Sequence, residues 1–359
     1  MNCPAAPYHE WAVIQEVKAI CAEQGFRCVA DKYGNLKVSL PFRPRGRVLA
    51  LAAHMDHPGF EVTRRLDRTK WLARFHGGVG DSYFRPRVPL RLMPGDLAAV
   101  LGRRVSKGRV FQLRASKAQS LRSPRPVRDD EPNFAVWELP DFEVRNGQIH
   151  GRSCDDLIGV ATVLATLMEL RRKRSAANVI GLISRAEEVG FQGALTLAAG
   201  KQIPKNAIIV SLETSKEIPP VKMGSGVIVR VGDRTSVFDS EATRYLTEVA
   251  GALGKSGLKF QRALMSGGTC EATAYQEFGF STCAVCVALG NYHNCAANDE
   301  IRAEYVSIED ALSMVELLVQ AARQLPAFDK ITGKLPQRLH KYLKEAKGRL
   351  TSRETQRNK

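Results

Sequence analysis

Residue types that bind metal ions or move protons recur along this chain, and most of them lie beside an apolar run. They are His54, Asp155, Glu187, Glu188, Glu213 and His293. Two imidazoles combined with several carboxylates favour Zn²⁺, Co²⁺ or Mn²⁺ over Mg²⁺ or Ca²⁺, which prefer oxygen ligands alone. The set therefore predicts a site for divalent metal ions, with zinc preferred and cobalt or manganese as alternatives.

The apolar runs beside these residues predict buried strands. His54 ends RVLALAAH, Glu187 and Glu188 come two residues after NVIGLIS, and Glu213 follows AIIVSL. In an open α/β sheet, ligands bind beyond the carboxyl ends of the strands. We therefore expect these side chains to meet at one edge of the sheet, where Asp155 joins them from the start of a helix.

Such a set could support hydrolysis by two metal ions. Metals about 3.5–4 Å apart share a bridging carboxylate, polarise a substrate carbonyl and lower the pKa of bound water towards about 7. A carboxylate outside the ligand set must then take the proton of that water and pass it to the leaving amine. The adjacent glutamates, Glu187 and Glu188, could divide these tasks as base and ligand.

Each residue also has a simpler interpretation. A single histidine after a strand is commonly structural, and adjacent glutamates are commonly solvated. Two aspartates before a helix, here Asp155 and Asp156, can act as an N-cap with a favourable helix-dipole interaction. These interpretations would have to coincide at five separate places, so the joint pattern favours a metal site.

The order of the predicted elements indicates an α/β fold. The run at residues 48–54 lacks polar alternation, which is typical of a strand buried on both faces. Apolar periodicity predicts helices at residues 8–24, 156–173, 239–253 and 307–324. Strands that alternate with helices indicate a mostly parallel sheet with helices on both faces.

Between the first strands and the first long helix, short alternating segments are broken by Gly, Pro and Arg. We predict a small all-β insertion there. The expected domains are a catalytic domain in two parts, residues 1–60 and 150–326, an inserted β domain at 61–149, and a basic C-terminal tail at 327–359. The tail is helix-prone, and we expect it to have little apolar stripe.

Positive charge is concentrated in two regions of a chain whose formal net charge is +16. Residues 61–128 carry 17 Lys and Arg against 4 Asp and Glu, and residues 330–359 carry 10 against 2. Such regions attract nucleic acid, anionic surfaces or acidic partners, or they only keep the protein in solution. No recognised nucleic-acid motif is present, so we expect no nucleic-acid partner.

The sequence contains no apolar run near the roughly 20 residues of a membrane span and no signal peptide pattern at its start, so we expect no membrane partner. Its eight cysteines follow no disulfide-framework spacing, which favours the reducing cytoplasm. Cys283 and Cys286 form a CxxC inside an apolar run, where buried thiols are the better interpretation.

Several segments resemble the glutamyl-aminopeptidase-like family of di-zinc metallopeptidases, which includes tetrahedral (cellulase M-like) aminopeptidases. They are AHMDHPGFEV, SCDDLIGVATVLATLMEL, AEEVGFQGA, SLETSKEIP, MGSGVIV, SGGTCEATA and YHN, in the family's order over about residues 8–325. The resemblance implies a di-zinc exopeptidase fold. It also implies an inserted small β-barrel domain that mediates assembly into homo-oligomers.

The resemblance further assigns metal ligands. His54, Asp155 and Glu213 would hold one metal ion, and Asp155, Glu188 and His293 would hold the other. Asp155 would then bridge the two ions.

It also assigns roles around the metals. Glu187 would be the general base, and Asp56 would orient His54. By the same resemblance we expect a cis peptide bond between Asp155 and Asp156, and loops near the active site at 224–226 and 265–269. His57 departs from the family's usual HMDEIG; it could be a spare ligand or pocket residue, and a surface or supporting role is the preferred interpretation.

Glu213 departs from the family, whose members usually have aspartate there; related deacylases and carboxypeptidases favour glutamate. The ligand set and the resemblance as a whole still predict a co-catalytic di-metal aminopeptidase that hydrolyses N-terminal residues from peptides through a metal-bound hydroxide. A deacylase or carboxypeptidase on the same scaffold is the alternative, and a non-enzymatic protein that binds through its basic surface is a third.

Overall fold

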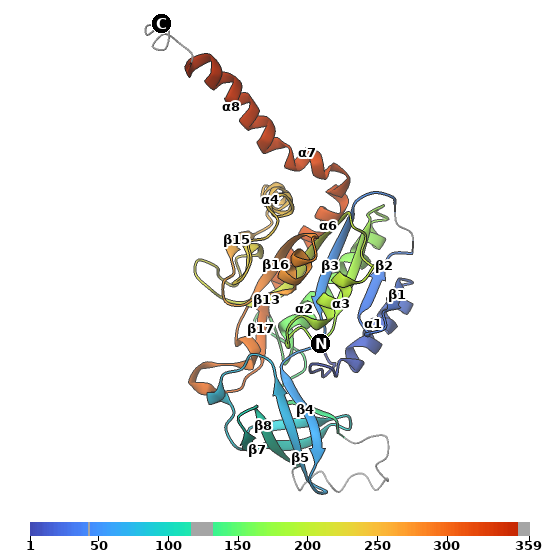
Figure 1. Cartoon of the computed structure of the whole chain (residues 1–359), viewed down its shortest axis with the longest axis vertical. Coiled ribbons are helices and arrows are strands. Elements are labelled where there is room, and N and C mark those ends of the chain that lie inside the picture. Colours follow the sequence, from blue (N-terminus) through green and yellow to red (C-terminus); the bar gives the residue numbers. More distant parts are fainter. Residues whose placement is uncertain (42–43, 116–131, 351–359) are drawn as a thin grey trace.

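The computed structural model describes residues 1–41, 44–115 and 132–350. A central sheet with helices on both faces forms the body of the molecule, a closed barrel lies at one end, and a helix projects from the other end (Figure 1). This is the predicted α/β fold with a β-barrel.

The central sheet has eight strands. Their order is β1 (Arg27–Ala30), β2 (Leu36–Ser39), β12 (Val179–Ser184), β3 (Val48–His54), β13 (Ala207–Lys216), β16 (Ser281–Leu289), β14 (Val227–Gly232) and β15 (Phe260–Leu264). The four central strands, β12, β3, β13 and β16, are parallel, and antiparallel pairs flank them at β1–β2–β12 and β16–β14. Every residue of β3 and β12 is buried, which explains their continuous apolar sequences.

Helices cover both faces of this sheet. One face packs against α1 (Trp11–Glu23), α2 (Cys154–Arg172), α4 (Ser240–Gly254) and α6 (Ile308–Gln324), and the other against α3 (Gln192–Ala199) and α5 (Glu271–Glu277). Two helices start at side-chain caps: Asp239 accepts a hydrogen bond from the backbone of Ala242, and Ser307 accepts one from Asp310. These helices shield from water the strands that position the site.

The barrel closes in the order β4 (Gly59–Arg65), β5 (Lys70–His76), β8 (Val110–Ala115), β7 (Leu97–Ser106), β6 (Pro89–Met93) and β9 (Phe134–Trp137). Its strands alternate between buried and more exposed positions, as in β5. The fully buried ring of Phe60 makes edge-to-face contacts with Phe75, Phe111 and Trp137 at its centre. Closure leaves no open sheet edge in the barrel.

A third, small sheet connects two segments that carry site residues. It consists of β10 (Glu143–Arg145), β11 (Gln148–Gly151) and β17 (Glu304–Ser307), with Gly151 opposite Glu304. Short 3-10 helices occur at η1 (Asp81–Tyr83), η2 (Tyr292–Asn294), η3 (Ala297–Asp299) and η4 (Leu325–Ala327). The small sheet therefore joins the start of α2 to the segment that follows η2.

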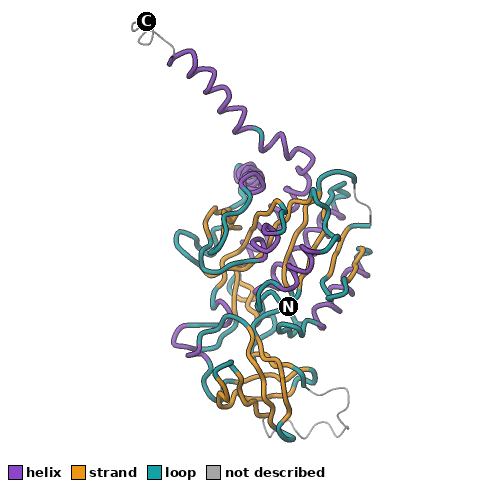
Figure 2. Tube along the Cα trace, in the orientation of Figure 1, coloured by secondary structure: helices purple, strands orange, loops and turns teal. Residues whose placement is uncertain are grey.

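The chain continues after α6 into α7 (Phe328–Thr332) and α8 (Lys334–Leu350), and Figure 2 shows α8 extending away from the body. The expectation of little apolar stripe in this tail is wrong, because four large apolar side chains of α8 lie on one side of the helix. They are Leu339, Tyr342, Leu343 and Leu350, all exposed. Among the described residues, no helix is long and apolar enough to span a bilayer.

The first prediction concerns Gly290, the residue directly after β16. Gly290 and Tyr305 exchange backbone hydrogen bonds of 2.9 and 3.2 Å, and a Cβ atom on Gly290 would overlap the Tyr305 ring. We expect Gly290→Ala to lower the free energy of unfolding by about 1–3 kcal/mol, measured by chemical denaturation. Gly251→Ala in α4 is the matched control, since no heavy atom lies within 4 Å of its Cβ position. Equal stability of the two variants would contradict this interpretation.

Candidate metal centre and catalytic cavity

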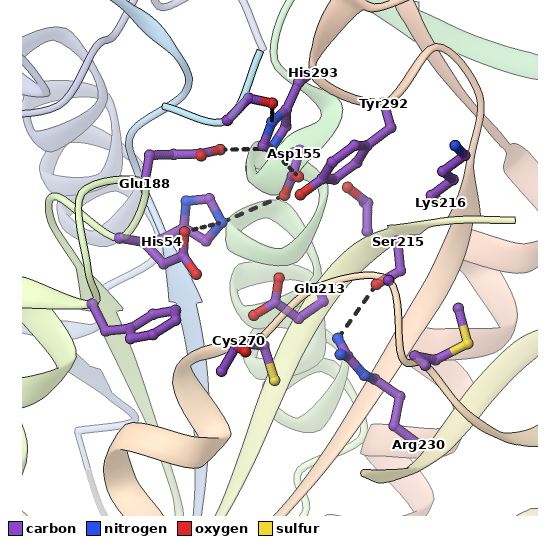
Figure 3. Close-up of a pocket in the computed structure, with 18 of the residues that line it drawn as sticks. His54, Asp155, Glu188, Glu213, Ser215, Lys216, Arg230, Cys270, Tyr292 and His293 are labelled. Carbon is purple, nitrogen blue, oxygen red and sulfur yellow. Dashed lines mark hydrogen bonds and ion pairs between the residues drawn. The ribbon is translucent and has the colours of Figure 1, made fainter. Parts of the chain in front are cut away.

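The structure brings two groups of potential metal ligands together. Ligand atoms of His54, Asp155 and Glu213 all lie within 4.8 Å of one another, and so do those of Asp155, Glu188 and His293. Asp155 belongs to both groups (Figure 3): its Oδ1 lies 3.4 Å from His54 Nε2, and its Oδ2 lies 3.5 Å from His293 Nε2. Each oxygen of one carboxylate thus faces a different imidazole, as a bridging ligand requires.

Strand ends and one helix start deliver these side chains to the same edge of the sheet. His54 is the last residue of β3, and Glu187 and Glu188 lie in the loop after β12. Glu213 was expected after its strand but lies inside β13, which continues to Lys216. The longer strand still exposes this side chain to the cavity at the same edge.

Asp155 and His293 lie in backbone of irregular conformation. Asp155 lies near the start of α2, has non-helical dihedral angles, and is joined to Asp156 by the expected cis peptide bond. His293 lies in η2 with a φ of 55°, a left-handed conformation. Both side chains are buried.

Backbone carbonyl groups fix the orientation of both imidazoles. His54 Nδ1 lies 3.1 Å from the carbonyl oxygen of Asp56, and His293 Nδ1 lies 2.9 Å from that of Gly78. A carbonyl oxygen only accepts, so each Nδ1 carries a proton, and Nε2 is the ring nitrogen that faces the carboxylates and that a metal ion would bind in the neutral imidazole. Gly78 follows β5 of the barrel, so the barrel helps to orient one of these histidines.

Asp56 supports more than the one histidine assigned to it. Its fully buried carboxylate lies 3.6 Å from His54 Nδ1 and also accepts the backbone N–H groups of Glu187 at 2.9 Å and Glu188 at 3.1 Å. Glu10, which the sequence analysis missed, accepts the N–H of Ala186 at 3.0 Å in the same loop. Two buried carboxylates therefore hold the loop that carries the paired glutamates.

Glu304 is a second buried carboxylate that the sequence analysis missed. One of its oxygens accepts the N–H of Asp155 at 3.0 Å, and the other accepts the N–H of His293 at 2.8 Å. Its position follows from the pairing of β17 with β11, which places it opposite Gly151. The sequence signal was weak: Glu304 is a charged residue in a short strand whose neighbours gave no hint of burial.

His57 is buried, so a surface role is wrong for it. Its Nδ1 lies 2.7 Å from the carbonyl oxygen of Asp155, and its Nε2 lies 3.0 Å from Asn294 Oδ1. It therefore connects the segments that carry Asp155 and His293.

Burial sets the charge state of the carboxylates. It raises the pKa of Glu187 well above its usual value and that of Glu213 to about 8. Burial alone would also raise the pKa of Asp155, but His293 and His54 outweigh it and lower that pKa. Buried carboxylates that lie this close together need nearby positive charge, such as that of a metal ion, to stabilise their ionised form.

The donor set also fits metal ions by its chemistry. Asp155 Oδ1 is buried and has no hydrogen-bond partner within the described part of the chain. Two imidazole Nε2 atoms and several carboxylate oxygens face a common space, in the mixture that zinc-type ions prefer. The residues therefore fit two divalent cations.

A cavity of about 270 Å³ adjoins these residues, and Figure 3 shows its labelled lining. As expected, the loop at 265–269 lines it, with Met265, Gly267, Gly268 and Thr269. Lys216 and Arg230 add positive charge to the wall. The loop at 224–226, expected beside the site, is absent from this lining; Gly224 and Ser225 border a different surface hollow, near α4.

Comparison with known proteins places the chain in a family. The sequence model described as M42 glutamyl aminopeptidase matches residues 132–317, more than half of the chain. The chain belongs to the M42 glutamyl aminopeptidase family. The predicted family and the predicted enzyme class, a metal-dependent aminopeptidase that hydrolyses peptides, are thereby confirmed.

Solved structures show the same fold. The TET1 peptidase of Pyrococcus horikoshii is 22% identical, with a TM-score of 0.70 over 89% of this chain and 96% of that chain. The TET aminopeptidase from Thaumarchaeota archaeon SCGC AB-539-E09 is 20% identical, with a TM-score of 0.73 over 92% and 97%. A dodecamer named PhTET1-12s is 24% identical, with a TM-score of 0.71 over 89% and 96%.

The second prediction concerns the role of Glu304 in metal binding. In Glu304→Gln an amide NH₂ would replace one acceptor oxygen, so either Asp155 or His293 would lose its backbone partner. We expect about 10–100-fold weaker Zn²⁺ binding, measured by calorimetric titration of the metal-free protein.

The matched control is Glu300→Gln, because Glu300 is half-exposed and pairs with Arg302 at 2.6 Å, away from the proposed ligands. Its metal affinity should equal that of the wild type. Unchanged affinity in Glu304→Gln, with the fold intact by circular dichroism, would refute the supporting role of Glu304.

Proposed function

We propose that this chain is a co-catalytic di-metal aminopeptidase that removes N-terminal residues from peptides, with Zn²⁺ as the preferred metal. The observation that carries the proposal is the pair of ligand groups that share Asp155. His54, Asp155 and Glu213 would hold one ion, and Asp155, Glu188 and His293 the other. When bound, the two ions supply the Lewis acidity that polarises a carbonyl and activates water.

Glu187 is proposed as the general base. It lines the cavity but belongs to neither ligand group, and its Oε2 lies 3.9 Å from His54 Nε2. Its carboxylate can accept the proton of the attacking water and donate that proton to the nitrogen of the leaving amine. The raised pKa caused by burial favours a group that can hold the proton between these steps.

The cavity wall would hold the substrate. An N-terminal ammonium group needs a carboxylate partner, and Glu187 or Glu213 can provide one within the cavity. Phe191, Ile218 and Met265 supply apolar surface for the side chain of the N-terminal residue.

Assembly and compartment are further parts of the proposal. We propose a homo-oligomer formed through the inserted β domain at 61–149. One similar structure is described as a dodecamer, and another protein as assembling into a tetrahedron or a large octahedral shell. All eight cysteines are free, which supports the reducing cytoplasm as the compartment.

A carboxypeptidase or deacylase on the same scaffold is the second candidate. Lys216 and Arg230 line the cavity, and Arg230 donates a hydrogen bond to Ser215 at 3.3 Å. Such cations could bind the carboxylate of a C-terminal residue or of an N-acylated amino acid. Glu213 also supports this alternative, because related enzymes of these types favour glutamate at this position.

The third prediction tests the base. Glu187→Gln keeps the size of the side chain but cannot accept a proton, so we expect kcat to fall about 10²–10⁴-fold. Metal content, measured by atomic emission, should stay at the wild-type level. Glu188→Gln should instead lose metal, because it removes a proposed ligand.

The control for general effects of substitution is Glu277→Gln, at the exposed end of α5. Its turnover should match the wild type. Turnover by Glu187→Gln within a few fold of the wild type would refute its role as base.

The fourth prediction separates the candidate functions. An aminopeptidase must bind a free N-terminal ammonium group, so acetylation of a peptide should abolish its hydrolysis, followed by mass spectrometry. Hydrolysis of the blocked peptide from its C-terminus, or loss of its acetyl group, would instead support the carboxypeptidase or the deacylase.

A further inference from the structure

Helix α8 carries an apolar face that the rest of the described structure leaves exposed. Leu339, Tyr342 and Leu343 are 53%, 53% and 51% exposed, and Leu350 is 81% exposed. No residue of α8 is buried. The helix lies after residue 317, where the family match ends, so the peptidase site does not account for it.

The sequence of α8 forms a continuous stripe. The apolar residues fall within a sector of about 100° around the helix, at 3.6 residues per turn. They are Leu335, Leu339, Tyr342, Leu343, Ala346 and Leu350. A stripe of this width would ordinarily face a core, yet it runs along a helix that projects from the body (Figure 1).

Basic residues occupy most of the remaining surface. The helix contains six of them against a single acidic residue, Glu345; the six are Lys334, Arg338, Lys341, Lys344, Lys347 and Arg349. At this helical spacing Arg338 and Arg349 border one edge of the stripe, and Lys347 borders the other. A partner that covers the stripe therefore meets an excess of positive charge along the helix, six basic residues against one acidic residue.

We propose that α8 binds an anionic phospholipid surface and lies in its interface, with the leucine stripe towards the acyl chains. A strongly amphipathic helix that is basic and polar outside one apolar stripe has the composition of such interfacial helices. Phospholipid headgroups supply negative charge on both sides of the stripe, and long basic side chains can reach them while their stems remain apolar. Two copies of α8 packed stripe to stripe would instead bring like charges together, which disfavours self-association.

The base of α8 is anchored, so the helix can hold the enzyme at such a surface. Lys334 Nζ lies 3.7 Å from Glu248 Oε2 of α4, and Leu335 borders a hollow with Phe238 and Thr243. The expectation of no membrane partner rested on the absence of a spanning run, and a helix that lies on a surface needs no such run. None of the α8 residues lines the catalytic cavity.

The fifth prediction uses the full-length protein and co-sedimentation with vesicles. Binding is expected to vesicles of phosphatidylcholine mixed with phosphatidylserine, to weaken with added salt, and to be absent with phosphatidylcholine alone. The double variant Leu339→Asn and Leu343→Asn should bind at least about tenfold more weakly, because it removes two apolar side chains without changing the charge.

The control is the double variant Gln337→Asn and His340→Asn, which introduces the same two asparagines outside the stripe, removes no apolar side chain, and should bind like the wild type. Both double variants should retain peptidase activity, which shows that the body is folded. The proposal is overturned if wild-type protein does not bind the anionic vesicles, or if the stripe variant binds them equally well. It is also overturned if the stripe variant changes the oligomeric state, since the stripe would then contact a second copy.

Discussion

The main constraint on this structure is electrostatic: several carboxylates lie close together in one partly buried space, which is unfavourable unless positive charge compensates them. Asp155, Glu187, Glu188 and Glu213 meet around one cavity at the edge of the central sheet, with Asp155 and Glu213 buried and the paired glutamates partly buried. Burial raises the pKa of Glu187 and of Glu213, neighbouring carboxylates raise it further, and His54 offsets only part of this rise. Divalent cations relieve this cost, so metal binding and the stability of this edge should be coupled.

A second set of buried carboxylates supports the first by a different interaction. Asp56 and Glu304 do not belong to either ligand group; each accepts backbone N–H groups from residues that carry proposed ligands or the proposed base. The backbone that presents Asp155, Glu187, Glu188 and His293 is thus held by side chains rather than by regular secondary structure.

The barrel takes part in this arrangement as well. The carbonyl group of Gly78, just after β5, accepts from His293 Nδ1, and the Tyr83 hydroxyl group donates to the carbonyl oxygen of Ala296 at 2.9 Å. An inserted domain that mediates assembly would therefore also contact the segment that carries a proposed ligand. Assembly and catalytic geometry could influence each other through these few hydrogen bonds.

The sequence by itself determined the fold class and the proposed ligands. Short unbroken apolar runs favour strands buried on both faces, and polar residues near their ends are expected to collect where parallel strands end. Only the tertiary structure revealed Glu304, Glu10, the burial of His57 and the true position of the loop at 224–226. These features arise from pairings between segments far apart in the chain, such as β11 with β17, which leave no local pattern. The stripe of α8 is the opposite case: its periodicity is present in the sequence, but only the structure shows that the described body leaves its large side chains exposed from Leu339 onward.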